Sequence, residues 1–63
     1  MSREQLADDT SRAMREFHTA MTTNGPGSDA ATVTGINLHT TWTTATAAGV
    51  TNDQILEAHH RTA

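Results

Sequence analysis

Apolar residues in the first third of the chain recur at the three- and four-residue spacing of one helix face. These positions are Leu6, Thr10, Ala13, Met14, Phe17, Ala20 and Met21, and charged residues occupy the other side. A capping sequence precedes them, because Ser2 is followed by Gln5 at the spacing of a capping box. The pattern therefore predicts an amphipathic helix over about residues 3–23.

A turn is predicted over residues 24–28, where the sequence reads Asn24-Gly25-Pro26-Gly27. Glycine supplies the positive φ of a tight turn, and proline cannot continue a helical hydrogen-bond ladder. Ser28 or Asp29 then offers an N-cap for the next element.

The segment from about residue 29 to 48 carries signals of both helix and strand. Its many β-branched residues favour a strand, and Ile36, Leu38, Thr40 and Trp42 alternate as they would in one. Its length favours a helix, because strands usually run for about 5–6 residues. We predict a helix, and an extended arm over residues 31–38 that pairs across a dimer stays open as the alternative.

Helical winding gives this segment two apolar stripes on roughly opposite sides. One stripe contains Ala31, Leu38, Trp42 and Ala45, and the other contains Val33, Ile36 and Ala47. Because a helix with two apolar stripes touches neighbours on both sides, one stripe is available for an intermolecular contact. Trp42 is interpreted as a core anchor packing on Phe17, with an exposed interface hot spot as the alternative. Gly35 predicts a kink or a close helix crossing.

The last third of the chain predicts a helix end, a sharp turn and a new helix over about residues 52–60. Gly49 suits the position after a helix end, Thr51 and Gln54 form a second capping box, and Val50 and Ile55 form its hydrophobic staple. The predicted fold is therefore all-α. It is one domain over residues 1–63, a long antiparallel helical hairpin followed by a short third helix in a helix-turn-helix-like arrangement.

The segment from Thr41 to His60 resembles the bacterial DNA-binding helix-turn-helix. The matching residues are Ala45 at the small position, Gly49 at the turn, and Val50, Ile55 and Ala58 at buried positions. The resemblance implies a dimeric transcriptional regulator with Thr51, Asn52, Gln54 and Arg61 at the DNA groove. Thr44 departs from the pattern, which usually has a larger apolar residue there. Asp53 and Glu57 depart more seriously, because their charges would face phosphates. A purely structural helix-turn-helix is the competing interpretation.

Composition and charge bear on three further properties: binding to polyanions, insertion into membranes and association with other proteins. The chain has 63 residues, no cysteine and a formal net charge of −3, which argues against a general polyanion binder. It has neither an apolar run near the roughly 20 residues of a membrane span nor the layout of a signal peptide, so we expect a cytoplasmic protein. A single core of this size contributes only about 3–5 kcal/mol, so self-association or a protein partner is expected.

No residue pattern predicts catalysis, a cofactor or a metal site. No serine or threonine has the surroundings of an activated nucleophile. Asp53, Glu57 and His60 share a helix face with the Glu-x-x-His spacing of di-metal bundles, but a solvated face on which Glu57 pairs with Arg61 is the simpler interpretation. His18 and His39 are interpreted as polar surface residues.

The sequence therefore favours a small non-enzymatic protein-interaction module, regulatory or accessory in role. It would act through self-association or a protein partner. The expected partner-binding residues are Val33, Ile36, Leu38 and Trp42. The alternative function is the dimeric DNA-binding regulator described above.

Overall fold

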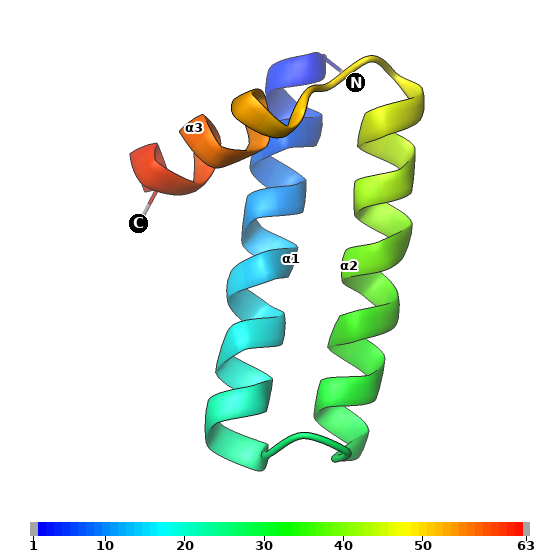
Figure 1. Ribbon diagram of the computed structural model, residues 1–63, viewed down its shortest axis with the longest axis vertical. Helices are drawn as coiled ribbons and strands as arrows, with labels where there is room; N and C mark the ends of the chain where they lie inside the picture. The colour runs from blue at the N-terminus through cyan, green and yellow to red at the C-terminus, as the bar shows by residue number, and fades with distance from the viewer. Residues whose placement is uncertain (1, 63) are drawn as a thin grey trace.

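The computed structural model describes residues 2–62, and this range folds into three helices. They are α1 (Arg3–Asn24), α2 (Asp29–Ala47) and α3 (Asn52–Thr62). α1 and α2 stand side by side as an antiparallel hairpin, and α3 crosses the N-terminal half of α1 and leads away from α2 (Figure 1). The predicted all-α fold is confirmed. Residues 31–38 are helical, so the extended-arm alternative is wrong.

Serine hydroxyls cap the first two helices. The Ser2 hydroxyl accepts a hydrogen bond from the Gln5 backbone N–H at 3.1 Å, and Ser28 accepts one from Ala31 at 3.1 Å. Ser28, rather than Asp29, is therefore the N-cap of α2. The turn between the helices needs a left-handed backbone at Gly25, where φ is 87°.

The junction between α2 and α3 is a Schellman motif, in which backbone N–H groups beyond the helix end bond back to its last carbonyls. The Val50 N–H donates to the Ala45 carbonyl and the Gly49 N–H donates to the Thr46 carbonyl, both at 3.0 Å. Gly49 has a φ of 93°, which favours glycine. The motif ends α2 and directs the chain toward α1.

The core lies where α3 crosses α1, and three of its six buried residues are alanine. Its members are Leu6, Ala7, Ala45, Val50, Ile55 and Ala58, with Met14 and Trp42 packed against it and partly buried. The residues matched to the small and buried positions of the helix-turn-helix are all buried in the structure, namely Ala45, Val50, Ile55 and Ala58. Trp42 packs against this core and is partly buried, whereas the Phe17 ring, on which it was predicted to pack, lies against Gly35.

In the half of the hairpin next to the turn, a side chain of α1 packs on a glycine of α2. A Cβ added at Gly35 would lie 3.2 Å from Cε1 of Phe17. Gly35 therefore leaves room for the Phe17 ring. None of the three described helices combines the length and apolar character needed to cross a bilayer.

Candidate protein-interaction surfaces

The side of α2 turned away from α1 carries exposed apolar side chains. We call it the outer face of α2, and its residues are Val33, Ile36, Thr40, Thr43, Thr44 and Ala47, all exposed. Val33 is 65% exposed and Ile36 is 64% exposed. These two residues belong to the second apolar stripe, which therefore has no partner among the described residues of the chain.

Two of the three threonines on this face, Thr43 and Thr44, bond their hydroxyls to the backbone of their own helix. The hydroxyl of Thr43 donates to the His39 carbonyl at 2.8 Å, and that of Thr44 donates to the Thr40 carbonyl at 2.9 Å. A hydroxyl bonded within its own helix does not need a partner elsewhere. A partner that covers this face therefore leaves neither of these two hydroxyls without a hydrogen bond.

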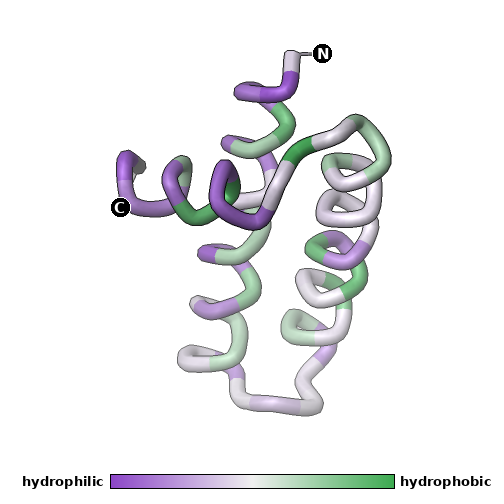
Figure 2. Tube along the Cα trace, turned by 45° about the horizontal axis from the view of Figure 1, so that its top comes forward, coloured by the Kyte–Doolittle hydropathy of each residue, from purple (hydrophilic) through white to green (hydrophobic). Residues whose placement is uncertain are grey.

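The outer face of α2 also lacks charge. Between Asp29 and Asp53 the sequence contains no Asp, Glu, Lys or Arg. Figure 2 shows α2 mostly in white and green, whereas purple is concentrated on α1 and α3. An apolar partner could cover this face without burying an ionic group.

The four predicted partner-binding residues fall on two different surfaces. Val33 and Ile36 lie on the outer face of α2, whereas Leu38 and Trp42 are half-buried. Trp42 packs on the core, and Leu38 lines a groove beside α1. The structure therefore does not join the four into one site.

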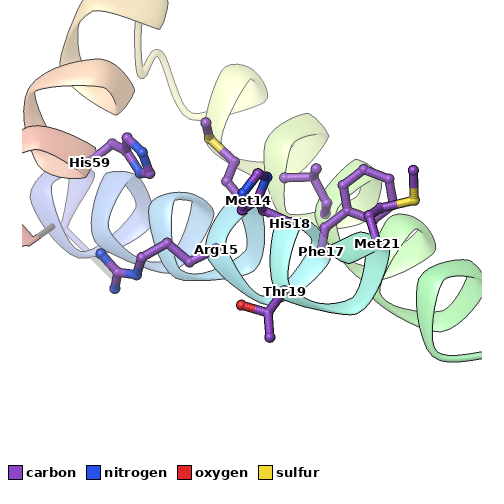
Figure 3. Close-up of a pocket in the computed structure, with 8 residues that line it drawn as sticks. Met14, Arg15, Phe17, His18, Thr19, Met21 and His59 are labelled. Atoms are coloured by element: carbon purple, nitrogen blue, oxygen red, sulfur yellow. The ribbon is translucent and has the colours of Figure 1, made fainter. Parts of the chain in front are cut away.

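This groove opens beside α1 below the point where α3 crosses it. Its floor contains Met14, Phe17, Met21 and Leu38, and its volume is about 670 Å³. Figure 3 shows the side chains of Met14, Phe17 and Met21 following one another along α1, with His59 reaching toward α1 from α3. We call it the α1 groove.

The spacing of apolar residues predicts that Met14, Phe17 and Met21 face the core, and it gives no indication of the groove. All three are only partly buried. The reason is the direction of α3, which crosses the N-terminal half of α1 and then leads away from the hairpin, so that it covers only part of α1 (Figure 1). The sequence carries no local signal for this direction.

The predicted DNA-contacting residues are mostly engaged within the fold. The Thr51 N–H donates to Oε1 of Gln54 at 2.8 Å, and the Gln54 N–H donates to Oγ1 of Thr51 at 3.2 Å, which confirms the capping box. Arg61 forms an ion pair with Asp8 and lies 3.8 Å from a carboxylate oxygen of Glu4.

The ion pairs of Arg61 correct one expectation. The sequence suggested that Arg61 pairs with Glu57 on its own helix, but it reaches across to α1 instead, because α3 lies against that helix. Asn52 is exposed, and so are Asp53 and Glu57. Among residues 2–62, no group of three or more His, Asp or Glu side chains is arranged to hold a metal ion.

No protein-family model, curated protein or solved structure gives a significant match to the chain. The functional inference therefore rests on the surfaces described above.

Titration with duplex DNA tests the alternative that the helix-turn-helix segment binds DNA. We expect a generic duplex at low salt to leave the amide NMR signals of residues 51–61 unshifted, because Thr51 and Gln54 cap α3 and Arg61 is paired with α1. The exposed carboxylates of Asp53 and Glu57 would also repel phosphates. Shifts concentrated in this segment that vanish at high salt would instead support DNA binding.

Proposed function

We propose that the chain is a small non-enzymatic protein-interaction module that acts through self-association or a protein partner. Its contact surface is the outer face of α2. The observation that carries the proposal is the exposure of Val33 and Ile36, at 65% and 64%, on a helix side without charge. In a chain whose buried cluster is half alanine, two large apolar residues left in water mark an association surface.

The chemistry of this face supports contact with another helix. Exposed alanine and threonine let helix backbones approach closely, and Val33 and Ile36 provide larger side chains that fit between a neighbour's ridges. The hydroxyls of Thr43 and Thr44 are already bonded to their own helix, so their methyl groups add to the apolar area. A second copy of the chain offers the same uncharged face and is the first partner to test.

Sedimentation of the wild type and of Val33→Asp and Ile36→Asp tests the proposal. We expect the wild type to associate as its concentration rises and each variant to stay monomeric, because association would bury an unpaired carboxylate. Circular dichroism is expected to show that both variants remain helical. Their unfolding free energies should lose the concentration dependence that association gives the wild type.

Leu56→Asp is the matched control, since Leu56 is also a large exposed apolar residue but lies on α3. It is expected to leave self-association unchanged. The proposal is contradicted if the wild type sediments as a monomer and both α2 variants leave its stability unchanged. It is also contradicted if Leu56→Asp abolishes association while the α2 variants do not.

A further inference from the structure

Five residues on the outer face of α2 follow the spacing of a coiled-coil seam. Val33, Ile36, Thr40, Thr43 and Ala47 recur at alternating intervals of three and four residues, and all are exposed. This heptad spacing places a row of side chains along one side of a helix, where it packs lengthwise on a second helix. Within residues 2–62 nothing covers the row, because α3 packs on α1 and leads away from α2 (Figure 1). We call these five residues the α2 seam.

The side chains of the α2 seam become smaller toward its C-terminal end. Val33 and Ile36 occupy the N-terminal end, whereas Thr43 and Ala47 occupy the C-terminal end. In a parallel pair of copies each residue would face its own counterpart, so the bulky ends would meet and hold the alanine ends apart. In an antiparallel pair the bulky end of each seam lies on the small end of the other, and the helices stay evenly spaced. The seam is therefore complementary to itself in the antiparallel arrangement.

The single formal charge of α2 favours the same arrangement. Asp29 is exposed and precedes Val33 by about one turn, on the side of the helix that carries the seam. In a parallel pair the two Asp29 carboxylates would face each other beside the apolar contact and repel. In an antiparallel pair centred near position 38 they lie at opposite ends of the contact, about 27 Å apart along the helices.

We infer that the α2 seam binds the seam of a second copy in an antiparallel, two-fold symmetric pair. This inference rests on the proposed function, and it adds the identity of the partner and its orientation. Val33 of one copy lies opposite Thr43 of the other, and Ile36 lies opposite Thr40. The two α2 helices form the centre of a four-helix layer, with α1 of each copy on the outside.

The size of this contact sets its strength. α2 has 19 residues and is about 28 Å long. One such helix from each copy buries less than the roughly 1,200 Å² at which specific stable interfaces begin, so the pair is weak and reversible. A second copy suits the seam because pairing removes Val33 and Ile36 of both chains from water at once.

Cysteine cross-linking of the full chain tests the orientation, because the chain has no cysteine of its own. Val33→Cys and Thr43→Cys are mixed in equal amounts, at a concentration where the wild type associates, and oxidised with glutathione disulfide. The mixed disulfide is expected to exceed each symmetric one at least about tenfold. In the antiparallel pair two copies of either position lie about 15 Å apart along the helices, whereas a disulfide needs Cα atoms within about 7 Å. Mass spectrometry distinguishes the three products.

Two further variants serve as controls. Leu56→Cys mixed with Val33→Cys measures unselective encounter, since Leu56 is exposed but lies on α3, and this mixed disulfide should form at least about tenfold more slowly. Asp29→Asn needs no cysteine. It is expected to change the dissociation constant of the pair by less than about twofold, because the two carboxylates lie at opposite ends of the contact. Circular dichroism checks that every variant remains helical.

Three results would overturn the inference, and they separate it from the proposed function. Symmetric disulfides in excess, or a threefold or greater tightening by Asp29→Asn, would show a parallel pair and leave the proposed function intact. Random proportions of the three disulfides in an associating protein would place the contact elsewhere than on the seam. A wild type that stays monomeric, with disulfides only at the rate of the Leu56 control, would exclude a second copy as the occupant. That last result also removes self-association from the proposed function.

Discussion

Ile55→Ala is expected to leave the protein largely unfolded at 25 °C. Ile55 is 1% exposed and sits in the cluster where α3 meets α1. Truncating a buried isoleucine to alanine costs about 2–5 kcal/mol, and a single core in a chain of this length supplies only about 3–5 kcal/mol in total. Alanine's higher helix propensity returns only about 0.5 kcal/mol. Loss of helical circular dichroism and an early urea midpoint are the expected observations.

Leu56→Ala is the control for this loss. Leu56 is the next residue of the same helix and is 49% exposed, so the same truncation should change the unfolding free energy by less than about 1 kcal/mol. If the two variants unfold at the same urea concentration, the cluster at the α1–α3 crossing does not hold the fold together. If only Ile55→Ala unfolds, α3 is an integral part of the domain.

Local signals in the sequence were enough to predict the three helices. Each helix start has a side chain that bonds to a nearby backbone N–H, and the turn glycines take conformations that other residues avoid. These interactions span three or four residues, so they can be recognised without knowing the fold. The predicted bounds consequently differ from the observed ones by one or two residues.

The surfaces were harder to predict because they depend on where α3 goes. Spacing showed that Val33 and Ile36 lie opposite the core stripe of α2, and their exposure follows from that alone. Spacing placed Leu38 on the opposite stripe, and it could not show that Leu38 would line a groove beside α1. The groove exists because α3 crosses α1 and stops, and no spacing within α1 specifies that crossing.

The burial of Ser11 also depends on where α3 crosses α1, and it was not predicted from the sequence. A serine on a charged helix reads as a surface residue, but Ser11 is completely buried at the α1–α3 crossing. Ala7 precedes it by one turn, so the two form a small-residue stripe on which α3 rests. Small residues at this spacing were the available signal, although alanine and serine are common enough in helices to make it weak. The buried hydroxyl is hydrogen-bonded, and Nδ1 of His59 lies 3.4 Å from it.

Replacing Ser11 by leucine is therefore expected to force α3 away from α1 and destabilise the protein by about 1–3 kcal/mol. The side chain has no exposed surface, and added carbons in a close-packed crossing displace their neighbours. Urea unfolding followed by the fluorescence of Trp42, the single tryptophan, measures the change. Amide shifts at Ala58 and His59 would locate it at the crossing.

Ser11→Ala separates the effect of size from that of the hydroxyl. Alanine keeps the close approach of the helices and removes the hydroxyl with its hydrogen bonds, the 3.4 Å contact with His59 among them, so we expect a loss below about 1 kcal/mol. A loss as large as that of the leucine variant would instead mean that the hydroxyl holds α3 in place. The expected order, with alanine tolerated and leucine not, would make Ser11 a spacer that sets how closely α3 approaches α1. Because His59 is carried by α3, that spacing also fixes the upper end of the α1 groove.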